Sequence, residues 1–162
     1  MNKIKMHRRP PGYLRIVKEV KYGHNDRIKL EKIEKGLSQL SKDKDTFQFI
    51  KIPDFSYEIE NNIVTVEHEF IRGETLTALL QFGHYDDVKR YGKLIYKDFV
   101  LRENKRTFAD YSLHNYVECE FTKELYIIDL EHYRHHELDK RKKRFFEIYG
   151  AFAPNYDWAG YK

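Results

Sequence analysis

The sequence predicts an α+β fold in which a small antiparallel sheet with one helix comes first and a mainly helical half follows. Three observations lead to this prediction. Short runs that alternate apolar and polar residues dominate the chain as far as Glu69, as in half-buried strands. Apolar residues at helical spacing dominate residues 86–103 and 138–149. Between these two helical segments, residues 116–119 and 125–128 make up a further pair of strand-like runs.

Length and composition favour one soluble domain over residues 1–162. The chain has 41% hydrophobic residues, enough to bury one core. Its 30 basic and 26 acidic residues are interspersed, so nucleic acid is not an expected partner. The single Cys119 excludes an internal disulfide and fits a reducing compartment. No apolar run has the length of a membrane span, and the basic amino-terminus lacks the apolar core of a secretion signal, so we expect a cytoplasmic protein.

The first third of the chain predicts an arm, a strand and a helix. Residues 1–12 are basic and end in Pro-Pro-Gly, which favours an extended or mobile arm. Residues 13–20, YLRIVKEV, alternate as in a strand. Asn25 or Asp26 can cap the helix that follows to about Leu40. The apolar stripe of this helix is expected to contain Ile28, Leu30, Ile33, Leu37 and Leu40.

Three more strands and a short helix are expected next. The strands are Phe47–Ile52, Phe55–Ile59 and Ile63–Glu69, and Asn61-Asn62 forms the hairpin turn between the last two. The short helix is Thr75–Phe82, and a glycine breaks it.

The carboxy-terminal part predicts two helices and a packed tail. The first helix spans residues 86–103. The second, residues 138–149, carries the basic run Lys140–Arg144, which is either a solvated face or a docking patch for an acidic partner. The aromatic tail is expected to pack on the helices with Trp158 as its anchor. A weaker possibility is a metal site on one helical face made of His132, His135 and His136.

The stretch from Phe108 to Glu131 carries the chemistry. Asp110 stands five residues before Asn115, and Asp129 ends an apolar run fourteen residues later. This spacing suits phosphoryl transfer from a nucleotide, because the first Asp can accept the proton of the attacking hydroxyl while Asn and the second Asp supply oxygens to Mg²⁺. The strand pair between Asn115 and Asp129 would hold both ligands on one rigid support. The simpler alternative is a surface hairpin in which these residues only make turns.

The order of Asp110, Asn115 and Asp129 resembles the catalytic loop and metal-binding Asp of the protein-kinase-like superfamily. Within it, Ala-Asp-x-Ser-x-x-Asn is most similar to the RIO branch of minimal atypical kinases, and the chain also resembles bacterial lipopolysaccharide and aminoglycoside kinases. The resemblance implies a truncated two-lobed kinase-like fold. Residues 13–70 would be a small amino-terminal lobe, and residues 71–162 a reduced carboxy-terminal lobe with a catalytic hairpin.

The resemblance also implies a lysine that binds the nucleotide phosphates and a glutamate that holds this lysine in place. Ile16-Val17-Lys18 resembles the kinase strand that carries the lysine, so Lys18 is the candidate and Lys21 its rival. The glutamate would come from the helix that follows. Glu34 is preferred, and Glu31, one turn away, stays open.

A kinase-like hinge is implied at Glu69, Phe70 and Ile71, where an apolar strand ends and Gly73 follows. In a kinase fold the backbone near these residues pairs with adenine. The resemblance therefore implies ATP and Mg²⁺ as cofactors and transfer to a hydroxyl acceptor, either a protein Ser/Thr or a small molecule, with Asp110 as catalytic base.

Two parts of a typical kinase lack counterparts. The twelve residues before Tyr13 contain no glycine-rich loop, and the 33 residues after Asp129 leave no room for the helices that dock peptide substrates. We therefore expect weak activity in isolation. The alternative is a pseudokinase-type binding module that docks an acidic partner through Lys140–Arg144.

Overall fold

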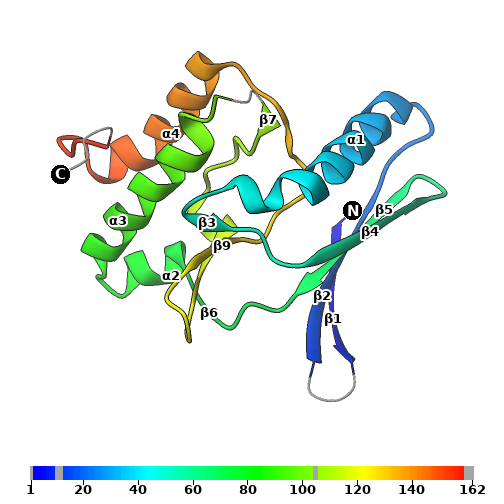
Figure 1. The fold of residues 1–162 in the computed structure, drawn as a ribbon, viewed down its shortest axis with the longest axis horizontal. Coiled ribbons are helices and arrows are strands. Elements are labelled where there is room, and N and C mark those ends of the chain that lie inside the picture. The colour runs from blue at the N-terminus through cyan, green and yellow to red at the C-terminus, as the bar shows by residue number, and fades with distance from the viewer. Residues whose placement is uncertain (1, 10–12, 104–105, 159–162) are drawn as a thin grey trace.

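The protein has an α+β fold with a sheet-rich side and a helical side. The structure, a computed structural model, describes residues 2–9, 13–103 and 106–158. Figure 1 shows β1, β2, β4 and β5 with α1 on one side of the molecule, α2, α3 and α4 on the other, and the short strands β3 and β9 between them.

The α-helices are α1 (Arg27–Asp43), α2 (Leu76–Gln81), α3 (Tyr85–Ile95) and α4 (Leu138–Phe152). A π-helical turn at Tyr96–Val100 extends α3, and 3₁₀ turns lie at Lys44–Thr46 and Leu113–Asn115. The strands are β1 (Asn2–Arg9), β2 (Tyr13–Lys21), β3 (Ile50–Lys51), β4 (Phe55–Glu60), β5 (Ile63–Glu69), β6 (Gly73–Thr75), β7 (Arg106–Thr107), β8 (Tyr116–Cys119), β9 (Leu125–Ile127) and β10 (Arg134–His135).

The first sheet is antiparallel, with the strand order β1-β2-β5-β4. The predicted hairpin turn is confirmed, because Asn61 and Asn62 have positive φ values of 51° and 62°, the backbone geometry that tight hairpins need. In β5, Val64, Val66 and His68 are buried while their neighbours are half-buried. This alternation turns one face of the sheet toward the core.

The basic arm over residues 1–12, predicted to be extended or mobile, is extended at Asn2–Arg9, which form β1 and pair with β2 along their whole length. The sequence of this segment alternates apolar and polar residues, which suits an edge strand. Pairing also gives hydrogen-bond partners to an edge of β2 that would otherwise stay open. Residues 10–12 lie outside the described residues.

The predicted strand Phe47–Ile52 is corrected in length. Only Ile50–Lys51 is a strand, and it pairs in parallel with β9. Asp98, on the π-helical turn, accepts hydrogen bonds from the backbone N–H groups of Gln48, Phe49 and Ile50 at 3.1, 2.7 and 2.7 Å. These donors are therefore bound to the helical side and are lost to a strand ladder.

The second four-stranded sheet has the order β3-β9-β8-β6 and contains the predicted strand pair as the β8–β9 hairpin. Tyr116 pairs with Ile127 and Glu118 with Leu125, in an antiparallel register. This hairpin packs into the core through fully buried side chains. They include Tyr116, Leu125 and Ile127.

Helix α1 confirms the predicted stripe except at its start. Leu30, Ile33, Leu37 and Leu40 are buried, but Ile28 is 69% exposed, so the buried stripe begins at Leu30. Gly36 completes the buried face. Asp26 is the N-cap residue, yet its carboxylate accepts a hydrogen bond from Gly23 N at 3.1 Å instead of capping the helix.

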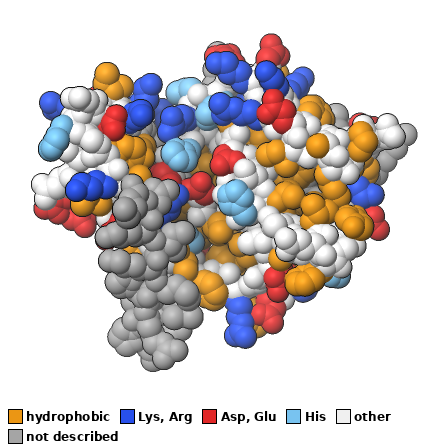
Figure 2. Space-filling view, turned by 180° about the vertical axis from the view of Figure 1, so that it is seen from behind, with side chains coloured by type: hydrophobic (Ala, Val, Ile, Leu, Met, Phe, Trp, Pro, Cys, Tyr) orange, Lys and Arg blue, Asp and Glu red, His pale blue; other side chains and the backbone are white. Residues whose placement is uncertain are grey.

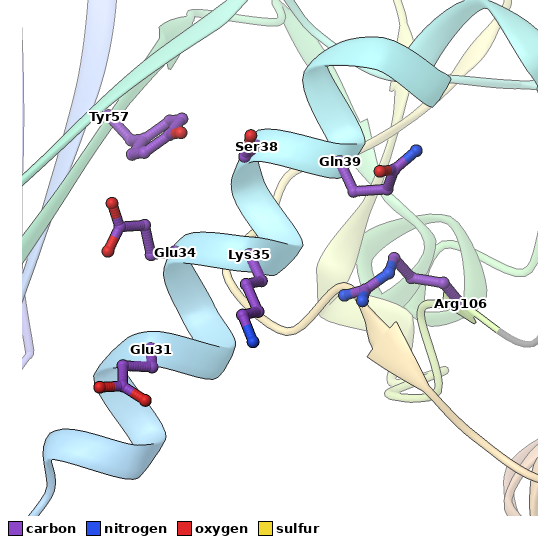
Figure 3. Close-up of a pocket in the computed structure, with 7 residues that line it drawn as sticks. All are labelled: Glu31, Glu34, Lys35, Ser38, Gln39, Tyr57 and Arg106. Atoms are coloured by element: carbon purple, nitrogen blue, oxygen red, sulfur yellow. The ribbon is translucent and has the colours of Figure 1, made fainter.

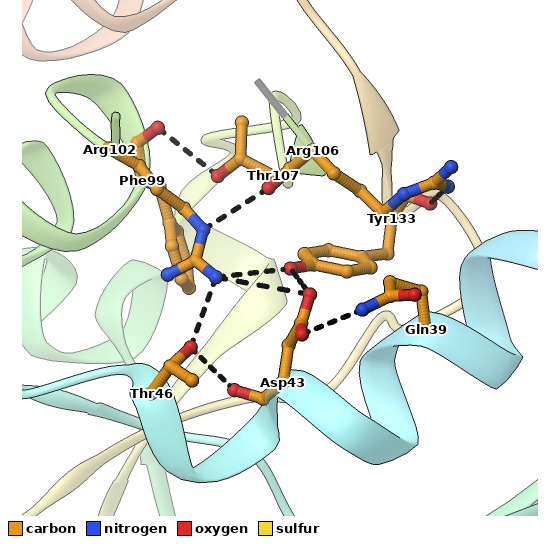
Figure 4. Close-up of polar contacts among 8 residues, drawn as sticks. All are labelled: Gln39, Asp43, Thr46, Phe99, Arg102, Arg106, Thr107 and Tyr133. Atoms are coloured by element: carbon orange, nitrogen blue, oxygen red, sulfur yellow. Dashed lines mark hydrogen bonds and ion pairs between the residues drawn. The ribbon is translucent and has the colours of Figure 1, made fainter. Parts of the chain in front are cut away.

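A polar network joins the end of α1 to the segment after Asp129 (Figure 4). The Tyr133 hydroxyl donates to Asp43 Oδ2 at 2.7 Å, and Arg102 Nη2 donates to Thr46 Oγ1 at 3.0 Å and to the Tyr133 hydroxyl at 3.3 Å. Because Asp43 ends α1 and Arg102 follows the π-helical turn, this network fixes the sheet side to the helical side.

The basic run of α4 is not a uniform surface. Arg141 is 3% exposed, and its Nη1 donates to the carbonyl oxygens of Phe99, Val100 and Arg102 at 3.3, 2.7 and 3.0 Å. The guanidinium thus satisfies carbonyls that the end of the π-helical turn leaves without partners. Lys140, Lys143 and Arg144 are exposed.

The predicted anchoring of the tail is confirmed at Trp158, which is 4% exposed and makes edge contacts with Phe145 and Tyr149 at 5.6 and 5.4 Å between ring centroids. The rest of the tail, residues 159–162, lies outside the described residues. In the described part of the chain, no helix combines the length and apolar character needed to cross a membrane.

Candidate functional site

A cavity of about 590 Å³ collects most of the sequence-predicted site residues. Figure 2 shows a hollow between the two sides of the molecule, with acidic and histidine side chains beside hydrophobic ones. The residues lining the cavity come from the two four-stranded sheets, from the segments that follow β5 and β9, and from the 3₁₀ turn before β8. They are Ile16, Lys18, His68, Phe70, Ile71, Gly73, Thr75, His114, Asn115, Val117, Ile128 and Asp129.

The β8–β9 hairpin sets Asn115 beside Asp129. Asn115 ends the 3₁₀ turn before β8, is 5% exposed, and accepts a hydrogen bond at its carbonyl from Ile128 N at 2.9 Å. Because Ile128 directly precedes Asp129, this bond fixes the two side chains next to each other at the end of the hairpin. The prediction of one rigid support for Asn115 and Asp129 agrees with this geometry.

Lys18 reaches the same place from β2. Its ammonium lies 2.9 Å from Asp129 Oδ1 and also contacts Glu131 Oε1. Burial disfavours the charge, but the charges of Glu131 and Asp129 outweigh it and raise the pKa of Lys18. The rival Lys21 is exposed at the end of β2 and does not line the cavity.

The carboxylate that holds Lys18 is Glu131, which the sequence reasoning missed. Glu131 is 3% exposed, and burial together with the neighbouring Asp129 raises its pKa to about 7. Although burial also disfavours the charge of Asp129, the hydrogen bond with Glu131 and the charge of Lys18 hold the pKa of Asp129 below its usual range. The signal was available in the Asp-Leu-Glu spacing, because alternate residues of an extended segment share one side.

Glu34 and Glu31 do not hold Lys18, so this prediction is wrong. The described residues include no ion pair or hydrogen bond of Glu34, and Glu31 pairs with Arg27 at 3.6 Å. Both line a different cavity of about 580 Å³ along α1. Figure 3 shows Glu34 on the side of α1 that faces Tyr57, with Arg106 farther along the helix. The buried stripe of α1 faces the core, which directs these glutamates elsewhere.

Asp110 lies next to this site but does not line the 590 Å³ cavity. Its Oδ1 accepts hydrogen bonds from Ser112 N at 3.1 Å and from Ser112 Oγ at 2.5 Å, and its carbonyl lies 3.5 Å from Asn115 Nδ2. Burial raises the pKa of Asp110, but the Ser112 donors outweigh it and hold the pKa below its usual value. The carboxylate is therefore ionised at neutral pH.

Only two of the three residues of the expected hinge reach the cavity. Phe70 and Ile71 line the cavity, whereas Glu69 does not. The backbone groups of Glu69 already have partners, since its N–H donates to Asp54 O at 3.0 Å and its carbonyl lies 2.7 Å from His68 Nδ1. Burial lowers the pKa of His68, so a neutral ring that donates from Nδ1 fits this contact. Of the three residues of the expected hinge, Phe70 and Ile71 are therefore the ones at the cavity.

The side chains at the cavity end suit a hard cation. Ligand atoms of Asp129, Glu131 and His132 lie within 4.8 Å of one another, and Asn115 lines the same cavity as Asp129. Amide and carboxylate oxygens are the ligands that Mg²⁺ prefers. The alternative of three histidines on one helical face is wrong, because Arg134–His135 form strand β10 and the helix begins only at Leu138.

Comparison with models of known protein families found no match, and comparison with curated proteins found none either.

Proposed function

We propose that this chain is an ATP- and Mg²⁺-dependent phosphotransferase with a reduced fold of the protein-kinase-like superfamily. The observation that carries the proposal is that Lys18, Asn115 and Asp129 line one cavity together with Phe70 and Ile71. A structural ion pair needs neither Asn115 nor an apolar recess beside it. Phosphoryl transfer from ATP needs a cation to neutralise the phosphates, oxygen ligands for the metal and an apolar pocket for the adenine ring.

Nucleotide binding would use both ends of the cavity. The adenine would lie against Ile16, Val117 and Ile128 and form hydrogen bonds with the backbone at Phe70 and Ile71. The Lys18 ammonium, at the other end, would offset the charge of the phosphates. Because it contacts both Asp129 and Glu131, its position is fixed before the nucleotide arrives.

Asn115 and Asp129 would hold the metal, with the Glu131 carboxylate as a further oxygen donor nearby. Mg²⁺ bound there would offset the negative charge of the phosphate oxygens. Asp110 is ionised and held by Ser112, so it can orient an acceptor hydroxyl and accept its proton. In the transfer, the hydroxyl oxygen bonds to the γ-phosphorus, the bond to the β,γ-bridging oxygen breaks, ADP leaves with that electron pair, and the hydroxyl proton passes to Asp110.

The alternative, a binding module that docks an acidic partner through Lys140–Arg144, has weaker support. Arg141, in the middle of the run, is buried and bonded to three backbone carbonyls, so the run does not present one continuous basic face. A binding module also has no need for an ionised Asp110 beside Asn115.

The test is the thermal unfolding midpoint with ATP, with and without Mg²⁺. At about one hundred times its Kd, MgATP would add about 2.7 kcal/mol to the free energy of unfolding, which raises the midpoint by about 5–10 °C for a chain of this size. Asp129→Asn should lose most of this rise. The control Asp139→Asn, at an exposed position of α4, should keep it. No rise at millimolar MgATP, or an equal rise in all three proteins, would contradict the proposal.

A further inference from the structure

Another, smaller cavity lies on the Asp110 side of the site. It has a volume of about 230 Å³ and is lined by Ala109, Asp110, Tyr111, Arg144, Glu147 and Ile148. The catalytic loop supplies the first three of these residues and α4 supplies the others. A candidate base and a guanidinium group therefore share one recess.

Arg144 is available to bind a ligand there. It is exposed, and the described residues include no ion pair or hydrogen bond that occupies its guanidinium, not even with Glu147 one turn along α4. The guanidinium of Arg141, three residues earlier, instead donates hydrogen bonds to backbone carbonyls. A planar guanidinium offers parallel N–H donors that match the oxygens of a phosphate.

Charges of both signs line this recess, Arg144 on one hand and Asp110 and Glu147 on the other. Near Arg144, burial and then the charges of Arg144 and Arg134 lower the pKa of His136 to about 4. The carboxylates of Asp110 and Glu147 oppose this charge. A ligand with an anionic group at Arg144 and a neutral hydroxyl at Asp110 would suit the positive charge of the first side chain and the negative charge of the second.

We propose that this recess binds the phosphate group of a small, phosphorylated hydroxyl compound, which is the acceptor of the transfer. Arg144 would hold the acceptor's phosphate and Asp110 its hydroxyl, so the compound gains a second phosphate from ATP and releases ADP and a proton. A volume of about 230 Å³ accommodates a phosphate with a few carbon atoms but not a folded segment. The inference rests on the proposed function for the transfer step, although binding of the anion can be measured without it.

The first experiment measures binding without nucleotide. Glycerol 3-phosphate, glucose 6-phosphate and their unphosphorylated parents are titrated into the full chain and followed by NMR chemical shifts. All titrations use the Lys18→Met background, so that phosphate cannot bind at Lys18. We expect each phosphate compound to bind at least tenfold more tightly than its parent. Arg144→Gln should weaken it at least tenfold, Arg144→Lys should restore part of the affinity, and Lys143→Gln, an exposed neighbour outside the recess, should change it less than twofold.

The second experiment measures label transfer from γ-labelled MgATP to the same compounds and to a serine peptide rich in glutamate, using the chain with Lys18 intact. Arg144→Gln should raise the KM for the phosphate compound at least tenfold and leave the KM for MgATP unchanged. Equal binding of phosphate compounds and parents, equal losses in Arg144→Gln and Lys143→Gln, or preference for the peptide would overturn the inference. If MgATP fails to stabilise the chain while Arg144-dependent binding persists, the proposed function fails and the anion site stands.

Discussion

Lys18 and Asp129 form a 2.9 Å ion pair although 111 residues separate them in the sequence. The same ammonium also contacts Glu131, so one cation lies between two carboxylates. The side chains of Lys18 and Asp129 are each 19% exposed and that of Glu131 is 3% exposed. In such a site each charge depends on the others, because removal of one partner leaves the rest buried and uncompensated.

Replacement of Lys18 should therefore reveal an energetic coupling between Lys18 and Glu131 in the free energy of unfolding. We expect Lys18→Met to lower the free energy of unfolding by about 3 kcal/mol, since it leaves two facing carboxylates without a cation. In the double variant Lys18→Met/Glu131→Gln the loss should be smaller than the sum of the single losses, by about 1–3 kcal/mol, because Gln removes one of the uncompensated charges. Urea denaturation of the four proteins measures this cycle.

Glu34→Gln is the matched control for this cycle. Glu34 is exposed and has no ion pair with a described residue, so the substitution should change the free energy of unfolding by less than about 0.5 kcal/mol, alone or with Lys18→Met. Additive effects of Lys18→Met and Glu131→Gln, or coupling of Lys18 to Glu34 instead, would show that α1 supplies the carboxylate after all.

The members of the site that the sequence predicted well are those fixed by local structure. Asn115 and Asp129 flank one hairpin, and the strand-like runs and their polar turn predict that hairpin without reference to the rest of the chain. Lys18 sits on an alternating strand of clear pattern. The spacing of Glu131 from Asp129 places both on one side of an extended segment, but the contact of Glu131 with Lys18 joins residues 113 positions apart, which no local pattern predicts.

Long-range pairing explains the remaining differences from prediction. β3 is two residues long, and its partner β9 lies some 75 residues away, so sequence periodicity near Ile50 carries no information about it. Asp98 keeps the rest of that segment out of a strand, because its carboxylate accepts hydrogen bonds from three of the segment's backbone N–H groups. In the same way, a basic run predicts a solvated face, and only the position of the π-helical turn makes Arg141 a buried cap.

Gly36 should be the least replaceable residue of α1. A Cβ atom at this position would lie 2.2 Å from the carbonyl oxygen of Tyr133, a backbone atom that cannot move aside cheaply. We expect Gly36→Ala to lower the free energy of unfolding by about 2–3 kcal/mol or more, because α1 must shift away from the segment that carries Glu131. Thermal and urea unfolding measure the loss.

Gly150→Ala is the control for the change of residue type. Gly150 lies within α4, where an added Cβ would approach no atom closer than 3.6 Å. Because Ala favours a helix over Gly, this substitution should raise the free energy of unfolding by up to about 1 kcal/mol. Equal effects of the two substitutions would refute the close approach of α1 to Tyr133.

Arg141 should contribute to stability and its neighbours in the basic run should not. Arg141→Met keeps much of the side-chain volume but removes the guanidinium donor from the carbonyls of Phe99, Val100 and Arg102, of which that of Phe99 keeps a second donor, the Thr107 hydroxyl. Loss of these partners should cost about 2–4 kcal/mol. Lys143→Met removes the same charge from an exposed position and should change the free energy of unfolding by less than about 0.5 kcal/mol. A similar small effect at both positions would contradict the capping role.

His136 should make stability depend on pH in the acid range. Its Nε2 is buried without a hydrogen-bond partner among the described residues, and burial together with Arg144, Arg134 and Arg141 lowers its pKa to about 4, against about 6.5 for an unfolded chain. Between these values the unfolded state binds the proton more readily than the folded state. The stability contribution is therefore fully present above pH 6.5 and is lost as the pH falls toward 4.

His136→Gln removes this titration, so the free energy of unfolding should fall less steeply between pH 6.5 and 4 in the variant than in the natural chain. His68 and His132, whose pKa values burial also lowers, remain in both proteins, and the difference between the two curves isolates His136. In NMR titrations of the folded chain, His136 should titrate near pH 4, and Arg144→Gln should raise that midpoint by removing a nearby positive charge. Parallel stability curves, or a midpoint that Arg144→Gln leaves unchanged, would show that Arg144 does not face this ring.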